Sequence, residues 1–103
     1  MKTLLLAAAS AGFFVMTGTA IADQQLAQKN ACMSCHGVDR KIVGPAFKDV
    51  AKKYDGDSKA VADLMAKVKA GSKGVWGPIP MPPNPQLKDD DSKKIIEWIL
   101  GLK

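Results

Sequence analysis

Apolar residues recur at helical spacing in several short segments of this chain of 103 residues, and no segment shows the strict alternation of a half-buried strand. The first predicted helix runs from Gln24 to about Met33, with Asp23 as its N-cap. The second covers residues 47–54, where the apolar side chains again fall on one face. Residues 37–46 contain a Gly-Pro pair and are expected to be irregular.

The second half of the chain predicts two more helices, separated by a long loop. Ser58 is expected to cap the third helix, and Gly71 to end it. The apolar stripe of that helix consists of Val61, Leu64, Met65 and Val68. Residues 71–85 are interrupted by prolines and glycines, so they are expected to form a loop whose apolar side chains are buried. Those side chains are Val75, Trp76, Ile79 and Met81.

The final helix is predicted to begin at residues 89–91, three aspartates whose negative charge suits the exposed amide groups of a helix start. Its apolar residues are too numerous for one surface stripe, so it should pack on the first helix. The predicted fold class is therefore all-α, a single domain with about four short helices and no sheet.

The N-terminus has the pattern of a secretory signal peptide. A short positive start precedes an apolar run over residues 4–16, and Ala20-Ile21-Ala22 supplies the small residues of a cleavage site. The run is shorter than the roughly 20 residues of a membrane span, and an uncleaved anchor is the alternative. Cleavage after Ala22 would remove residues 1–22 and leave a soluble domain, residues 23–103, in the periplasm.

Removing the signal peptide takes away Lys2 and lowers the net formal charge from +5 to +4. The remaining lysines are scattered, so neither nucleic acid nor membrane insertion is expected. They either steer the protein toward acidic partners or only keep it in solution. A chain this short has a small core that needs a staple.

The candidate chemistry lies in Cys32-Met33-Ser34-Cys35-His36. Two cysteines separated by two residues and followed by a histidine form the attachment sequence of c-type haem. Each thiol adds across one vinyl group of the porphyrin, and His36 is carried under the ring, where its imidazole binds the iron. Because both cysteines are used, the macrocycle takes the place of a disulfide as the staple.

Other roles for the cysteines fit the sequence less well. A structural zinc site takes four ligands, and the chain has two cysteines and one histidine. A thioredoxin-type redox pair belongs to a βαβ unit, which the pattern does not predict. A short-loop disulfide is still open, but it leaves His36 without a role.

The sixth iron ligand is expected to be one of the five methionines, because the chain has a single histidine. Two methionines leave with the signal peptide, and Met33 lies inside the attachment turn. Met65 falls on the apolar stripe of the third helix, where core packing is the simpler role. Met81 is the first candidate, flanked by prolines that restrict its loop before the bond forms.

The chain resembles the small bacterial class I cytochromes c of the c-551/c-552 type. The resemblance covers residues 23–103 and is carried by three runs. The runs are Cys-Met-Ser-Cys-His at 32–36, Val-Gly-Pro-Ala at 43–46 and Gly-Val-Trp-Gly-Pro-Ile-Pro-Met-Pro-Pro-Asn at 74–84. It implies a small cytochrome c fold around one covalently bound haem c. A monomer is the default for this type.

The resemblance also implies the ligand set. Cys32 and Cys35 carry the thioether links, and His36 and Met81 are the axial ligands of the iron. The carbonyl of Pro45 is implied to accept the other ring proton of His36, which orients the imidazole.

Three further positions take roles from the resemblance. Trp76 is implied to donate its indole proton to a haem propionate, with core packing as the alternative. Asn84 is implied to hydrogen-bond near the Met81 sulfur. Lys67 stands where relatives often have an arginine near a propionate, and because lysine does not make the same bidentate contact, its role is open.

The expected function is a soluble periplasmic carrier of single electrons, not an enzyme. It would take electrons from a quinol-oxidising complex and pass them to a terminal oxidase or nitrite reductase. One alternative is a peroxidase-like haem enzyme or gas-binding protein with a labile Met81, and another is a haem domain fixed inside a larger complex. An apolar slot for the ring is expected, lined by Cys35, His36, Pro45, Trp76, Ile79 and Met81.

Overall fold

The computed structural model of the protein describes the backbone of residues 17–103 and the side chains of residues 21–103. The signal peptide predicted at residues 1–22 lies largely outside this range. Helix α1, Thr17–Lys29, passes through the expected cleavage point after Ala22, and cleavage there stays a prediction.

The part of the chain that the structure describes contains four α-helices, one short 3₁₀-helix and no strand. They are α1 (Thr17–Lys29), η1 (Cys32–Ser34), α2 (Phe47–Lys53), α3 (Ala60–Ala70) and α4 (Asp89–Leu100). Two isolated β-bridges, His36 with Lys41 and Ser72 with Met81, tie the two long loops. The predicted all-α fold class is confirmed.

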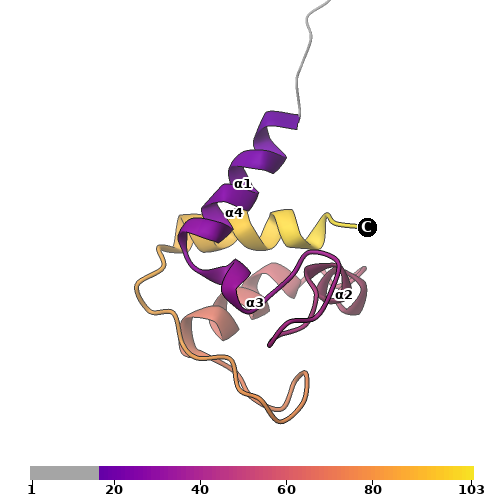
Figure 1. Ribbon diagram of the computed structural model, residues 1–103, viewed down its shortest axis with the longest axis vertical. Helices are drawn as coiled ribbons and strands as arrows, with labels where there is room; N and C mark the ends of the chain where they lie inside the picture. The colour runs from indigo at the N-terminus through magenta and orange to yellow at the C-terminus, as the bar shows by residue number, and fades with distance from the viewer. Residues whose placement is uncertain (1–16) are drawn as a thin grey trace, which may run out of the picture.

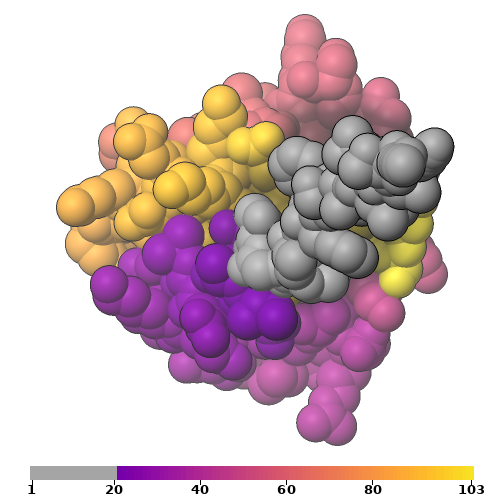
Figure 2. Space-filling view, turned by 90° about the horizontal axis from the view of Figure 1, so that it is seen from above, coloured from indigo at the N-terminus to yellow at the C-terminus, as the bar shows by residue number. Residues whose placement is uncertain are grey.

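Helix α4 lies across the middle of the molecule and contacts each of the other three α-helices (Figure 1). Helix α1 crosses it on one side, while α2 and α3 lie on the other. From above, the indigo end of the chain and the yellow C-terminal segment lie side by side (Figure 2). The predicted contact between the first and last helices is therefore confirmed.

The sequence of α4 explains its central position. Its buried side chains recur three and four residues apart, so they share one face of the helix. They are Ser92, Ile95, Ile96 and Ile99. The apolar core joins this face to α1, to α2 and to the loop before α4, and consists of Ala27, Phe47, Val50, Leu87, Ile95 and Ile99.

Two predicted helix starts are wrong. Helix α1 begins at Thr17, because the residues before Asp23 continue the helix, so Asp23 lies inside it instead of capping it. Helix α3 has Lys59 at its N-cap, which leaves Ser58 outside the helix. The Asp57 carboxylate accepts a hydrogen bond from the Lys59 amide at 2.8 Å, a short-range turn that a charged oxygen forms readily.

The first helix also ends earlier than about Met33. Helix α1 stops at Lys29, and Ala31 adopts a left-handed φ of 65°. The side-chain amide of Asn30 donates to the carbonyl of Leu26 at 2.9 Å, which satisfies an acceptor at the helix end. The chain then turns into η1, which carries the first cysteine.

The other boundaries follow the predictions. Helix α3 ends at Gly71, which has a φ of 82°. Helix α4 has the three aspartates 89–91 in its first turn. Residues 71–85 contain no helix, and α2 covers nearly the whole of the predicted 47–54 segment.

Ser92 generates a prediction about stability, because its Oγ is buried without a hydrogen-bond partner among the described residues. Replacing it by alanine removes an unsatisfied hydroxyl and improves helix propensity. Ser92→Ala should therefore raise the free energy of unfolding by about 1 kcal/mol. Denaturant titration followed by circular dichroism measures it. Ser58→Ala, at an exposed site outside α3, is the control and should change stability by less than about 0.5 kcal/mol. A destabilised Ser92→Ala would contradict the prediction.

Candidate functional site

The two cysteines lie on a tight turn that follows α1. The amides of Cys35 and His36 both donate to the carbonyl of Cys32, at 3.3 and 3.1 Å. This turn places the cysteines and the histidine at the wall of one cavity. Cys32 is half-buried, and this burial raises the pKa of its thiol.

His36 is held by contacts on several sides. Its Nδ1 lies 2.8 Å from the carbonyl oxygen of Pro45. Because a carbonyl only accepts, Nδ1 carries the proton, which leaves Nε2 free to bind a metal. The ring stacks on Phe47 with a centroid distance of 4.9 Å and an interplanar angle of 18°. The structure therefore contains the Pro45 contact that the resemblance implies.

Gly44 leaves the space that the imidazole ring of His36 occupies. A Cβ at this position would lie 2.5 Å from Cε1 of His36, closer than non-bonded atoms approach. The loop is folded into this position by the Cys35 carbonyl, which accepts from the amides of Val43 at 3.0 Å and Gly44 at 2.7 Å. The amide of Phe47 donates to the carbonyl of Gly37 at 2.8 Å and closes the loop.

The backbone of Met81 is fixed at the other wall of the cavity. It exchanges two hydrogen bonds with Ser72, one of 3.1 Å and one of 2.8 Å. Gly71 permits this approach, because a Cβ there would lie 2.9 Å from the Met81 carbonyl oxygen.

Asn84 holds the chain beyond Met81. Its backbone amide donates to the carbonyl of Val68 at 2.9 Å. Its side-chain amide donates to the carbonyl of Pro82 at 3.1 Å and to that of Val68 at 3.5 Å. Asn84 also lines the cavity, and its hydrogen bond to the Met81 sulfur stays a prediction.

The cavity measures about 330 Å³ and has mostly apolar walls. Its lining includes every residue expected around the slot: Cys35, His36, Pro45, Trp76, Ile79 and Met81. Cys32 and Asn84 line it as well. The predicted slot is therefore confirmed.

The expected burial of the 71–85 loop is wrong for two residues. Trp76 is 39% exposed and Ile79 is 59% exposed. Both line the cavity, together with the exposed Val43. These side chains face the cavity and its mouth, not the core that α4 organises. Core packing, the alternative for Trp76, therefore does not describe its position.

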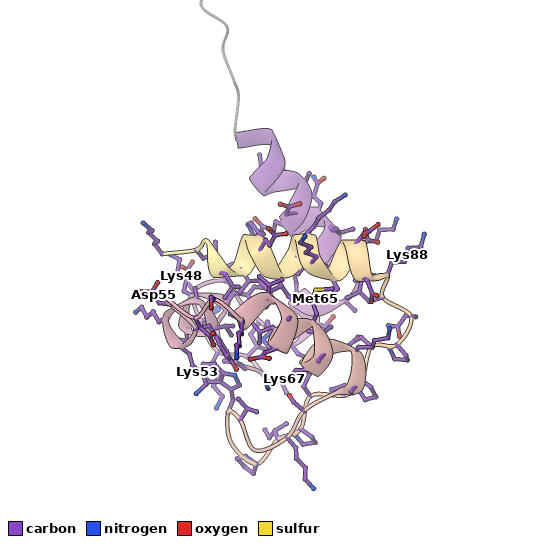
Figure 3. All side chains as sticks on the ribbon, turned by 180° about the vertical axis from the view of Figure 1, so that it is seen from behind. Lys48, Lys53, Asp55, Met65, Lys67 and Lys88 are labelled. Carbon is purple, nitrogen blue, oxygen red and sulfur yellow. The ribbon has the colours of Figure 1, made fainter. Side chains whose placement is uncertain are left out.

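The three methionines considered for the sixth iron ligand differ in whether they line the cavity. Met81 lines the cavity, whereas Met33 and Met65 do not. Met33 packs against the core cluster, and Met65 lies on α3 on the side of α4 (Figure 3). Within the described residues no group of three or more histidine, cysteine or acidic side chains is placed to hold a metal ion.

The donor set and the walls of the cavity fit haem. A flat apolar ring suits mostly apolar walls, two thiols suit its vinyl groups, and an imidazole and a thioether suit its iron. The charged groups among the lining residues are mainly cations, which suits the acidic propionates of the ring. They are Lys41, Lys67 and Lys73, with Asp49 as the acid.

Sequence reasoning missed several residues of the site. At Gly44 and Gly71 the missing side chain lets His36 and Met81 lie close to the backbone. The only sequence signal for these two positions is a glycine next to a loop that carries a candidate ligand. Phe47 was assigned to a helix face, although it also stacks on His36. The position of Lys53, whose ammonium lies over Trp76, had no sequence signal.

No helix in residues 17–103 combines the length and apolar character needed to cross a membrane. The family model described as cytochrome c matches residues 21–103. Cytochrome c-552 of Nitrosomonas europaea is 50% identical over 103 residues, which cover 100% of both chains. Cytochrome c-551 of Allochromatium vinosum is 55% identical over 84 residues, 82% of this chain and 89% of that relative.

Solved structures agree with this similarity. The crystal structure of wild-type Nitrosomonas europaea cytochrome c552 matches with a TM-score of 0.75 at 52% identity. The match covers 78% of this chain and 99% of that one. The crystal structure of the class 1 cytochrome MtoD from Sideroxydans lithotrophicus matches with a TM-score of 0.66 at 33% identity, over 86% and 98% of the two chains.

The contact between Gly44 and His36 generates a prediction. Gly44→Ala should displace the imidazole, because the added Cβ would overlap it, and should lower the free energy of unfolding by about 1–3 kcal/mol. The absorption spectrum of the haem-loaded protein and a denaturant titration measure both effects. Gly101→Ala is the matched control, because its Cβ would make only ordinary contacts at 3.6 Å. Equal behaviour of the two variants would contradict the proposed packing.

Proposed function

We propose a place in respiratory electron transfer for this chain, which belongs to the cytochrome c family, carries one covalently bound haem c and acts as an electron carrier. The observation that carries the proposal is that Cys32, Cys35, His36 and Met81 all line one mostly apolar cavity. The similarity to cytochromes c-551 and c-552 over nearly the whole chain supports it.

Different residues are proposed to attach the haem, to bind its iron and to orient the histidine ligand. Cys32 and Cys35 would form the thioether links, and the Nε2 of His36 and the thioether of Met81 would bind the iron. Haem supplies the one-electron couple of its iron when bound. The Pro45 carbonyl keeps the proton of His36 on Nδ1, which makes Nε2 the ligand atom.

The Met81 thioether is a neutral ligand, which favours ferrous iron and raises the reduction potential. Its backbone hydrogen bonds to Ser72 limit how far the ligand moves between the two oxidation states. A small change in ligand position between oxidation states suits an electron carrier. An enzyme would instead need the sixth position of the iron open to its substrate. We therefore assign no catalytic residue, and Trp76 and Asn84 complete the cofactor site.

The proposed route of electrons runs from a quinol-oxidising complex to a terminal oxidase or nitrite reductase. The proposed location is the periplasm, as a soluble monomer of residues 23–103 released by signal peptidase. The export signal supports this location, because covalent attachment of haem takes place there in bacteria.

The mouth of the cavity is the proposed contact surface for these partners. Exposed apolar side chains gather there, and lysines adjoin them. The apolar residues are Val43, Trp76 and Ile79. A partner docked at this mouth lies next to the ring, which shortens the path for an electron. The contact should be small and weak, because a carrier leaves after each transfer.

Met81→Ala tests the ligand set. Loss of the thioether should lower the potential, remove the weak near-red absorption band of methionine-bound ferric haem, and speed the binding of cyanide or carbon monoxide. Redox titration and stopped-flow spectroscopy measure these changes. Met65→Ala is the control and should affect stability alone. If Met81→Ala kept the wild-type potential and band while Met65→Ala lost them, the proposed ligand would be wrong.

The salt dependence of electron transfer tests the contact surface. Lysines at the cavity mouth should attract an acidic partner over a long range, so the second-order rate should fall as the screening length shrinks below about 10 Å. Stopped-flow mixing with the purified oxidase or reductase measures it.

A charge reversal locates the effect. Lys73→Glu, at the cavity, should slow the reaction more than Lys88→Glu, whose residue does not line the cavity. A rate that is independent of salt would leave the apolar contacts as the sole basis of docking.

A further inference from the structure

Lys53 makes a contact that the cofactor site does not yet explain. Its ammonium nitrogen lies 5.4 Å from the centroid of the Trp76 ring, within the range of a cation–π interaction. Lys53 is the last residue of α2, and Trp76 belongs to the loop that carries Met81. The contact therefore joins two segments at the mouth of the cavity, with Trp76 in its wall.

A second cation lines the cavity itself. Lys67, on α3, lines the cavity and is half-buried. Figure 3 shows Lys53 and Lys67 on the same side of the molecule, toward the loop of residues 72–81. Neither takes part in the ion pairs that the described residues form, which are Lys48 with Asp39 and Lys69 with Asp89.

Neither cation is paired with a nearby acid among the described residues: Asp63, one turn before Lys67 on α3, forms no ion pair with it. Asp49, one turn before Lys53 on α2, is the acidic residue of the cavity wall, and it forms no ion pair with either lysine. Lys67 lines a mostly apolar cavity, and Lys53 lies over Trp76, which lines it too. Two such cations without an ion pair suit a ligand with an apolar body and a carboxylate at that edge.

We propose that Lys53 is a further cofactor-contacting residue, whose ammonium, held over the Trp76 ring, neutralises a propionate carboxylate of haem together with Lys67. The inference rests on the haem site proposed above and deepens it. It assigns the lysine pair the charge that a single bidentate arginine would supply.

The charge of Lys53 has a direction of effect on the iron. A propionate anion favours the ferric state, because ferric haem carries one more positive charge than ferrous haem. A cation paired with that anion offsets the preference and raises the potential. Removing the cation should therefore shift the equilibrium toward ferric haem.

The test compares adjacent lysines in the haem-loaded protein. Lys53→Gln and Lys52→Gln remove the same charge from neighbouring exposed positions at the end of α2, and only Lys53 lies over Trp76. Lys53→Gln should shift the ferric–ferrous equilibrium toward ferric by about two- to fivefold, the range of an exposed ion pair. Lys52→Gln should shift it by less than half as much. Lys53→Arg keeps the cation and should restore the wild-type potential.

Spectroscopy gives a second readout. The NMR resonance of the Trp76 indole N–H should move in Lys53→Gln and stay in place in Lys52→Gln, because only Lys53 lies over that ring. Equal potentials and equal indole resonances in the two glutamine variants would overturn the proposal and leave Lys53 as a surface charge.

The test of Lys53 can fail or succeed independently of the test of the proposed iron ligands. The near-red band of the ferric wild-type protein reports Met81 ligation and does not depend on Lys53. A wild-type protein without the band would refute the ligand set. The difference between Lys53→Gln and Lys52→Gln would still decide whether Lys53 acts on haem.

Discussion

The hydrogen bond between Nδ1 of His36 and the Pro45 carbonyl is the contact on which the site depends. It keeps the proton on Nδ1, which leaves Nε2 as the nitrogen available to the proposed iron, and it orients the ring at the cavity wall. The loop of residues 37–46 has the geometry this bond requires, with Gly44 against the ring on one side and Phe47 stacked on it. Met81, the proposed second ligand, lines the same cavity.

The core and the cofactor site share their side chains. Phe47, Val50, Leu87, Ile95 and Ile99 form the apolar cluster, and all of them also line the cavity. A ring placed in that cavity would therefore extend the core of a short chain. Cofactor binding and folding are thus linked, because a group that binds only the folded state stabilises it.

Much of the fold and most of the site could be predicted from the sequence. The attachment run fixes Cys32, Cys35 and His36 by its chemistry, and the prolines around Met81 identify the loop. Helix ends were less predictable: Asp57 acts where Ser58 was expected, since both residue types make such turns. Contacts between residues far apart in the sequence could not be predicted. The contact of Lys53 with Trp76 depends on how α2 packs beside a loop more than twenty residues further along the chain.

The loop of residues 72–81 begins and ends at the same place. Ser72 and Met81 are bonded to each other through their backbones, and Gly71 lets the two ends meet at the end of α3. A closed loop of this kind separates its tip from its base. The tip carries Trp76 and Ile79 in the cavity wall, so a change there would alter the surface offered to a partner, while the two bonds at the base would keep the backbone of Met81 in place.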